Sequence, residues 1–256
     1  MLKSVALSSI AWVFLIFCWW LLTARIPTPI VDPLFLASPR ATFAALRSGF
    51  FQPLGLGWDL VYTLLRALGG FCIASILGVP LGLLLGGNSL ARRLLSSLID
   101  GLRSMPATAL FPVFLLAFGG GEASKVAVAI FVCLWAMVIY TASGVMITGE
   151  TRRFLLRQHK VTRSQFFLDG LLYPALPNIL GGMRATLSLA FVITIGVEML
   201  VGTKLGLGHS IYVAQTTYQI PTMYAAVVLA AIAGIILNRL LLLLIPLVVR
   251  WEAPQR

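Results

Sequence analysis

Long apolar stretches alternate with short polar segments along most of the chain. Six of these stretches approach or exceed the roughly 20 apolar residues that the core of a bilayer requires. Glycine and proline occur inside several of them, which membrane helices tolerate, and small residues there allow close helix packing. The pattern therefore predicts six membrane-spanning helices, at Ser8–Ala24, Leu60–Gly87, Leu94–Phe118, Lys125–Thr148, Met183–Val201 and Met223–Val249.

The segment between the first two predicted spans has a different pattern. Its first half is rich in proline, and Ser38-Pro39 is typical of a helix start. Phe43, Leu46 and Phe50 then recur at helical spacing. We therefore expect residues 34–58 to hold a short amphipathic helix on the external membrane surface. No repeat or low-complexity tract marks off a second unit, so we expect one domain, residues 1–256.

The composition of the chain is that of a membrane protein. Hydrophobic residues make up 59% of the chain and charged residues only 11%, whereas a soluble domain carries roughly 25% charged residues. Such a chain cannot cover its surface with polar groups, so we expect an all-α polytopic membrane bundle. The net charge of +11 does not indicate a nucleic-acid partner, because no basic stripe interleaved with aromatic residues is present.

The distribution of lysine and arginine predicts the orientation in the membrane. With six spans both termini lie on one side, and most of the basic residues between the spans fall on that side. Cytoplasmic loops are enriched in Lys and Arg. We therefore expect both termini and the loop 149–180 to be cytoplasmic, and Arg25–Trp58 and Lys204–Pro221 to face outward.

Motifs for catalysis or cofactor binding are absent from the sequence. It contains no GxxxxGK[ST] phosphate loop, no HExxH and no close pair of carboxylates. Cys18, Cys72 and Cys133 each lie in an apolar stretch, at spacings that fit neither a metal site nor a disulfide framework. His159 and His209 lack ligand-like neighbours. We expect a chain that is not an enzyme and binds no cofactor or metal.

Ionisable residues inside the predicted spans are the best candidates for function. A charge in hydrocarbon is costly and normally faces the bundle interior or a wet cavity. Glu198 and Arg66 are therefore candidates for a solute pathway. For Arg66, Asp100 and Arg103 a snorkelling side chain or an interhelical ion pair is the simpler interpretation, and Arg239 has no obvious partner in the sequence.

The most basic part of the chain, Thr151–Pro177, lies between two apolar stretches. Apolar residues alternate there with Arg and Lys at roughly helical spacing. A basic amphipathic helix can lie on the anionic inner leaflet. It can also present one face to a groove of a cytoplasmic protein. Periodicity alone leaves both interpretations open.

Several segments, taken in order, resemble the transmembrane permease subunits of ABC importers, in the nitrate/taurine/sulfonate branch. The resemblance runs from about Phe35 to the end of the chain. It is carried by FLASPRATFAAL, TLLRALGGFCIASILGVPLGLLLG, LRSMPATALFPVFLLAFGGGEASKVAVAIF, ALPNILGGMRATLSLAF and the GLG at Gly206–Gly208. In the family the third segment looks like LR-x-(I/V)-P-P-x-A followed by WFG-x-GE-x-SK.

The resemblance implies a type I importer fold and a division of labour. Two permeases form the pathway, two cytoplasmic ABC ATPases bind ATP and Mg and supply the energy, and a periplasmic or lipid-anchored binding protein delivers the solute. This chain would then be a multi-pass subunit of the bacterial inner membrane. The missing phosphate loop agrees with ATP hydrolysis in a separate chain.

The resemblance also makes the loop 149–180 the segment that couples to the ATPase. The family pattern is EAA, three residues, Gly and a stretch ending in LP-x-x-LP, and this chain departs from it. Aligned from Ala175-Leu176-Pro177, the EAA positions hold Phe154, Leu155 and Leu156, and Lys160 stands at the glycine. The coupling residues implied are Phe154, Leu155, Leu156, Arg157, Lys160, Ser164 and Gln165.

The function expected is inward transport of a small anionic solute, such as nitrate, a sulfonate, taurine or bicarbonate, by alternating access. The degenerate coupling loop favours a heterodimer with a second permease, although a homodimer stays open. A non-transporting scaffold or regulatory subunit that retains the fold is the main alternative. A secondary transporter is less favoured, because we find no internal repeat.

Overall fold

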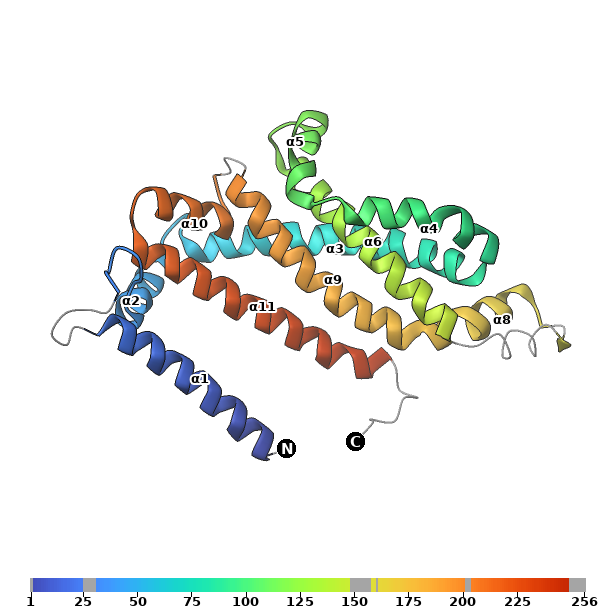
Figure 1. Ribbon diagram of the computed structural model, residues 1–256, viewed down its shortest axis with the longest axis horizontal. Coiled ribbons are helices and arrows are strands. Elements are labelled where there is room, and N and C mark those ends of the chain that lie inside the picture. The colour runs from blue at the N-terminus through green and yellow to red at the C-terminus, as the bar shows by residue number, and fades with distance from the viewer. Residues whose placement is uncertain (1, 25–30, 148–157, 160, 201–203, 249–256) are drawn as a thin grey trace. The chain divides into compact units, whose positions relative to one another are not determined.

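The computed structural model describes residues 2–24, 31–147, 158, 159, 161–200 and 204–248, and the described residues contain helices and no strand (Figure 1). This confirms the all-α prediction. The elements are α1 (Leu2–Thr23), α2 (Pro39–Phe50), α3 (Leu56–Gly87), α4 (Ser89–Ser104), α5 (Ala107–Phe118), α6 (Glu122–Ile147), α8 (Arg163–Phe167), a π-helical turn η1 (Leu168–Leu172), α9 (Tyr173–Leu200), α10 (Leu207–Thr216) and α11 (Ile220–Val248).

Four described helices are long and apolar enough to cross a membrane. They cover Leu56–Gly87, Glu122–Ile147, Ser164–Leu200 and Ile220–Leu243. These correspond to the second, fourth, fifth and sixth predicted spans, although the fifth helix begins at Ser164 and not near Met183, so the described end of the predicted loop 149–180 is helical. The described apolar part of α1, Ile10–Thr23, is shorter, so six spans remain a prediction.

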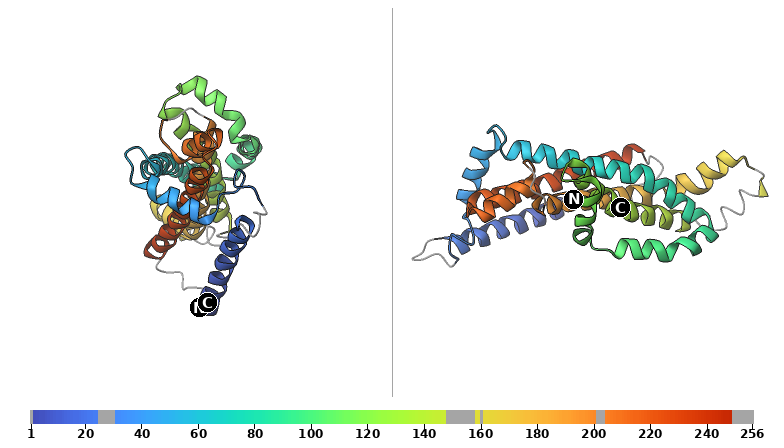
Figure 2. Two further views of the ribbon diagram at one scale, coloured as in Figure 1. Left: turned by 90° about the vertical axis from the view of Figure 1, so that its left-hand side faces the viewer. Right: turned by 90° about the horizontal axis from the view of Figure 1, so that it is seen from above.

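The third predicted span, Leu94–Phe118, is not one straight helix. It consists of α4 and α5, bent by 92° at a short break (Figures 1 and 2). Pro106 causes the break, because proline lacks the N–H of a continuing helix and keeps the preceding residue out of the helical region. Met105 accordingly has φ −70° and ψ 125°. The prediction of a single helix here was wrong, and the pair counts as at most one span.

The chain divides into two compact units. The first comprises Met1–Tyr62 and Glu198–Ile232, and the second comprises Thr63–Val197 and Ala233–Arg256. Helices α3, α9 and α11 contribute residues to both units. The single domain expected from the sequence stays a prediction.

In the second unit, α3 and α6 pack along a seam of small residues. Small residues of α3 recur every four positions along this seam, and a Cβ atom on Gly78, Gly82 or Gly86 would lie only 2.5–2.8 Å from the Cβ of the facing residue. The α3 side of the seam is Gly70, Ala74, Gly78, Gly82 and Gly86, and the α6 side is Ala129, Cys133, Met137, Thr141 and Val145. We call this the α3–α6 seam. It confirms that small residues inside the spans serve close helix packing.

Helix α9 packs against α6 through two further glycines. A Cβ on Gly144 would lie 2.7 Å from the Cβ of Asn178, and a Cβ on Gly182 would collide with Tyr140. Apolar side chains from α3, α6 and α9 pack together in a cluster of Leu83, Met137, Val145, Ala175 and Ile179. Since lipid gives no hydrophobic drive for helix association, such close packing is what holds the helices together.

In the first unit, α1 is held near its C-terminal end. The indole Nε1 of Trp19 donates a hydrogen bond to the carbonyl of Ala37 over 2.9 Å, and the Trp19 ring lies 6.3 Å from that of Tyr224. Tyr224 in turn donates to the carbonyl of Phe35. Helix α2 begins where the sequence predicts, with Ser38 as N-cap and Pro39 in the first turn.

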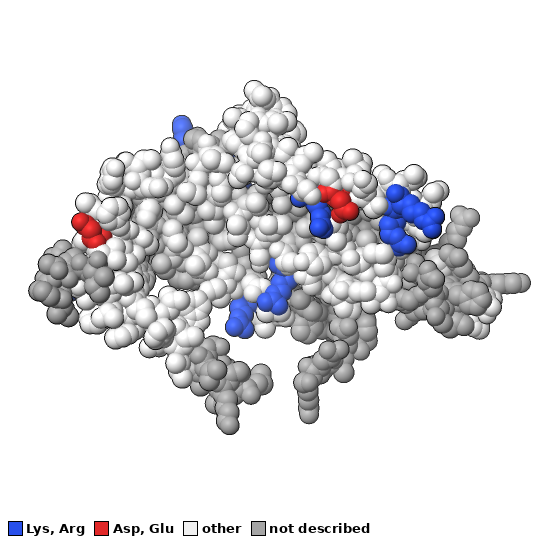
Figure 3. All heavy atoms as spheres, in the orientation of Figure 1, with Lys and Arg blue, Asp and Glu red and all other residues white. Residues whose placement is uncertain are grey.

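The surface carries few charges. On the face drawn in Figure 3, the described Lys, Arg, Asp and Glu side chains form a few small groups, and wide uncharged areas lie between the groups. Many large apolar side chains are exposed, among them Phe14, Leu65, Ile76, Leu116 and Val192. A surface of this kind suits contact with lipid.

Candidate functional site

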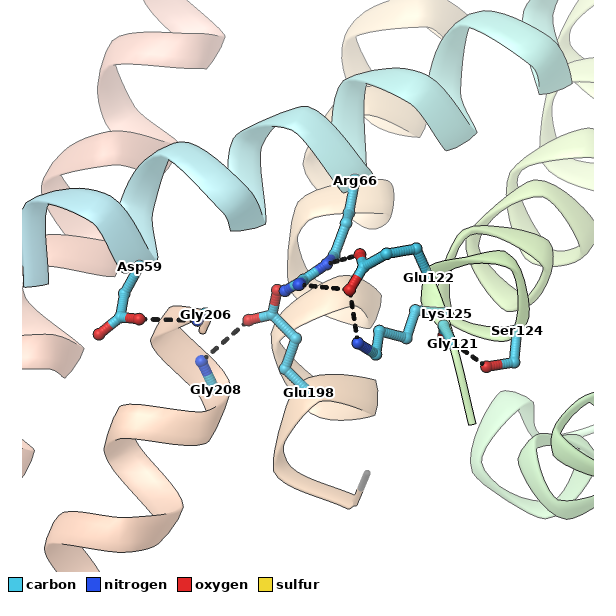
Figure 4. A network of polar contacts seen from close by, with 9 residues as sticks. All are labelled: Asp59, Arg66, Gly121, Glu122, Ser124, Lys125, Glu198, Gly206 and Gly208. Atoms are coloured by element: carbon cyan, nitrogen blue, oxygen red, sulfur yellow. Dashed lines mark hydrogen bonds and ion pairs between the residues drawn. The ribbon is translucent and has the colours of Figure 1, made fainter. Parts of the chain in front are cut away.

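Arg66 lies at the centre of an ion-pair network in the second unit (Figure 4). It comes from α3, and its Nη2 and Nε donate to the two carboxylate oxygens of Glu122 over 2.9 and 2.5 Å. The Nζ of Lys125 donates to the same carboxylate over 2.8 Å. The two cationic side chains are 5% and 4% exposed, whereas Glu122 is 60% exposed.

This network connects two helices. Glu122 and Lys125 occupy the first turn of α6, where a carboxylate also interacts favourably with the helix dipole. Because Arg66 belongs to α3, the bidentate pair fixes the beginning of α6 to that helix. The geometry is that of the interhelical ion pair considered for Arg66 from the sequence, and its place in a solute pathway stays a prediction.

Glu198 belongs to a second network, in the first unit (Figure 4). Its side chain is fully buried, and its Oε2 accepts a hydrogen bond of 3.0 Å from the backbone N–H of Gly208. Asp59, also buried, accepts from the N–H of Gly206 over 2.8 Å and from the hydroxyl of Ser210 over 2.5 Å. Both carboxylates thus accept hydrogen bonds from residues at the start of α10.

The chemistry of this second network is that of a helix cap. A buried carboxylate is costly unless hydrogen bonds compensate it, and the free N–H groups of a helix N-terminus provide them together with a favourable dipole. Gly206 is required here because its φ is 140° and a Cβ would lie 2.6 Å from Cδ of Glu198. The role of Glu198 in a solute pathway is a prediction that this geometry leaves untested.

Most of the predicted coupling residues, Phe154, Leu155, Leu156, Arg157 and Lys160, lie outside the described residues. Ser164 and Gln165 are described, and both are exposed at the start of α8. Gln165 forms a capping box with Thr162, because its Oε1 accepts from the Thr162 N–H over 3.0 Å and its own N–H donates to the Thr162 hydroxyl over 3.3 Å. Gln165 therefore starts the helix that leads into α9.

The other ionisable residues noted in the sequence make weaker contacts. Arg103 and Asp100 form an exposed pair of 3.8 Å within α4, which is worth little in free energy. Arg239 is exposed. Its neighbour Asn238 instead accepts a hydrogen bond from Nε of Arg184 over 2.5 Å.

Sequence reasoning missed the roles of four side chains in the two networks, namely Glu122, Lys125, Asp59 and Ser210. The signal for the first two was present, since Glu and Lys three residues apart at a helix start lie on one face. The signal for Asp59 was its position in the first turn of α3, although nothing in the sequence places it near Gly206.

Comparison with known proteins gives a consistent result. The family model described as "Binding-protein-dependent transport system inner membrane component" matches residues 78–252. The nitrate import permease protein NrtB of a Synechocystis strain is 31% identical over 77% of this chain and 72% of its own length. The bicarbonate transport system permease protein CmpB of Synechococcus elongatus is 27% identical over 86% of this chain and 81% of its own length.

Solved structures share the fold. A chain of the MetNI methionine ABC transporter in an inward-facing conformation has a TM-score of 0.65 at 19% identity, and the match covers 76% of this chain and 96% of that one. A chain of an amino acid ABC transporter crystallised with histidines has a TM-score of 0.60 at 16% identity, covering 83% and 97%. At these identities the likeness concerns the fold alone.

Proposed function

Because this chain belongs to the family of binding-protein-dependent transport system inner membrane components and is the permease subunit of an ABC importer, we propose that it forms the inward pathway for a small anionic solute. The match over residues 78–252 carries this proposal, since it includes the loop expected to contact an ATPase. The relatives named for nitrate and bicarbonate support an anion as the solute.

Partners supply what the chain itself lacks. Two cytoplasmic ABC ATPases with bound ATP and Mg drive the cycle, a periplasmic or lipid-anchored binding protein delivers the solute, and a second permease completes the pathway. No cofactor is bound by this chain. Alternating access between outward-open and inward-open states moves the solute, and both termini lie in the cytoplasm.

The loop 149–180 is the proposed contact with the ATPase. In support, the described part of this loop leads without a break into the fifth span, because Ser164–Leu200 runs as one helix of 37 residues. The capping box of Thr162 and Gln165 fixes its start. A displacement of the loop by an ATPase would therefore act directly on a membrane helix.

Reconstitution tests the proposal. The permease is co-expressed with the ATPase and binding protein encoded beside its gene, and ATP-dependent uptake is measured in proteoliposomes. Leu155→Asp combined with Leu156→Asp is expected to abolish ATPase association or solute-stimulated ATP hydrolysis, because charge replaces the apolar groove contact. Gln158→Asp with His159→Asp is the matched control, since both side chains are exposed in the same loop.

Two results would contradict the proposal. Normal stimulated hydrolysis in the leucine double variant would show that this loop does not couple. The absence of any ATPase association in the wild type would favour the scaffold or regulatory subunit instead. Purification through a tagged ATPase also tests the subunit composition, because recovery of two copies of this chain and no second permease would rule out the heterodimer.

A further inference from the structure

A cavity of about 550 Å³ lies within the second unit, beside the break in the third span. Its walls come from the end of α4, the start of α5, α6 and α9, and they include Arg103, Met105, Phe131, Trp135 and Tyr140. No residue of the two polar networks described above lines this cavity. The volume falls in the range of roughly 300–1,000 Å³ that is common for ligand pockets.

The break is a structural reason to expect something other than lipid at this place. Met105 and Pro106 have extended backbone conformations and are exposed. Non-helical backbone at membrane depth is tolerated only where protein covers it or where it lines a water-filled cavity. Discontinuous membrane helices frequently build solute sites in transporters for this reason.

The electrostatics of the cavity favour an anion. Arg103 is its one lining cation, and the described lining residues include no Asp or Glu. The nearest carboxylate of its own helix, Asp100, is 3.8 Å away in an exposed pair, which leaves the guanidinium available to a ligand. The first turn of α5, whose Ala107 lines the cavity, has no side-chain cap, so its N–H groups add to the positive potential.

The remaining walls favour a ligand with an apolar body. Apart from Arg103 they are aliphatic or aromatic, with Phe131, Trp135 and Tyr140 all on α6. An inorganic oxyanion occupies a volume on the order of one or two water molecules, about 30 Å³ each, and would leave most of such a cavity empty. The indole Nε1 of Trp135 is buried and makes no hydrogen bond to a described residue.

We propose that this cavity is a solute site within the permease, specific for an organic anion with one oxyanion head group near Arg103 and an apolar body against the aromatic wall of α6. The inference rests on the proposed function and narrows the solute from small anions in general. The N–H of Trp135, which lines the same cavity and has no described hydrogen-bond acceptor, is the candidate for a second donor.

Binding to the purified full-length chain tests the site without the rest of the transporter. Thermal unfolding in detergent is followed during titration with benzenesulfonate, with nitrate at equal ionic strength, and with methyl phenyl sulfone, which matches benzenesulfonate in shape but has no charge. A ligand that binds only the folded state stabilises it by RT ln(1 + [L]/Kd), so the unfolding temperature rises as the ligand concentration exceeds Kd. Benzenesulfonate is expected to raise it, and the other two probes are expected to have little effect.

Variants then locate the site. Arg103→Gln is expected to weaken the apparent affinity for benzenesulfonate at least about tenfold, as the loss of one charged hydrogen bond implies. Trp135→Phe, which keeps an aromatic ring but removes the N–H, is expected to weaken it less. Arg93→Gln is the control, because Arg93 is exposed on the same helix and does not line the cavity.

The three titrations of the unaltered chain test the proposal by themselves, so the test does not depend on whether a variant folds. An equal shift with methyl phenyl sulfone would mean an apolar gap that lipid or detergent fills, and an equal shift with nitrate would contradict the organic ligand. No shift with benzenesulfonate would mean that the cavity is no solute site. None of these results affects ATP-dependent uptake in proteoliposomes, so failure of the site and failure of the proposed function are distinguishable.

Discussion

Gly206 shows how one residue determines the start of α10. Its φ of 140° and the carboxylate of Glu198 leave no room for a Cβ. Gly206→Ala is expected to destabilise the chain by about 2 kcal/mol or more, from backbone strain together with displacement of a buried carboxylate. Thermal unfolding of the purified variant in detergent measures the loss.

Gly196→Ala is the matched control for this prediction. Gly196 lies in α9, and no heavy atom lies within 4 Å of the Cβ that alanine would add. Alanine is also the better helix former, so this variant is expected to be as stable as the wild type or slightly more stable. Equal losses in the two variants would show that the conformation of Gly206 has no special importance.

Glu122 is the residue on which the Arg66 network depends. Glu122→Gln removes the negative charge that two buried cations share. We expect a loss of about 1–3 kcal/mol, below the roughly 3–5 kcal/mol of a fully buried pair, because Glu122 is 60% exposed. The unfolding temperature in detergent provides the measurement.

Asp100→Asn provides the comparison for Glu122→Gln. It removes a carboxylate from a pair that is exposed on both sides and 3.8 Å long, so the change is expected to stay within about 0.5 kcal/mol. A loss as large as that of Glu122→Gln would mean that burial of the cations does not determine the strength of the network.

At the scale of single residues, the sequence identified candidate site residues more successfully than the contacts that these residues make. Glu198 and Arg66 were chosen because a charge inside a span is costly and normally faces the bundle interior or a wet cavity, and the structure places both in polar networks. Their partners were not predictable. Glu198 accepts from the backbone N–H of Gly208, which any residue type but proline could donate, and Arg66 meets Glu122 only because two helices distant in sequence pack together. Asp59 was missed because an acid at a helix start is also common without any tertiary role.

At the scale of elements, the α3–α6 seam makes the clearest prediction. A Cβ on Gly82 would lie 2.5 Å from Cβ of Thr141 and 2.7 Å from the carbonyl oxygen of Val138. Gly82→Ala is therefore expected to force the helices apart and to cost about 1–3 kcal/mol. Gly69→Ala in the same helix meets no atom within 4 Å and is expected to be harmless.

Unfolding in detergent compares the two variants directly. Because they introduce the same side chain into one helix, differences in helix propensity largely cancel. A Gly82→Ala variant as stable as Gly69→Ala would show that the two helices separate at little cost, against the close packing of the seam.

Helix positions were largely predictable from the sequence, and the bend was not. Runs of apolar residues located α3, α6, α9 and α11, since only length and hydropathy are needed for that. The bend between α4 and α5 was missed although Pro106 was visible, because membrane helices frequently continue through proline. The start of α2 was predicted correctly from Ser38 and Pro39 because capping depends on local sequence alone.

For the molecule as a whole, the orientation in the membrane is the main prediction. In a chain whose Cys18, Cys72 and Cys133 are replaced by serine or alanine, a single cysteine is introduced by Phe51→Cys or by His159→Cys. Both positions are exposed. A membrane-impermeant maleimide added to spheroplasts is expected to label only Phe51→Cys, because positive-inside topology puts the loop that contains His159 in the cytoplasm.

Inverted membrane vesicles provide the complementary measurement. There the same reagent is expected to label His159→Cys and not Phe51→Cys. Labelling of His159→Cys from outside would reverse the orientation, and the contact of that loop with a cytoplasmic ATPase would then be impossible.

The α3–α6 seam has one more consequence, which concerns register. Its small residues recur every four positions on α3 and face residues with the same period on α6. If α3 slid by four residues, about 6 Å along the helix axis, small residues would again face the same row of residues on α6. The repeat therefore fixes how closely the two helices pack, but it allows more than one alignment of α3 along α6. The bidentate pair of Arg66 and Glu122 forms in only one of these alignments. It therefore selects one alignment among those that the small residues allow.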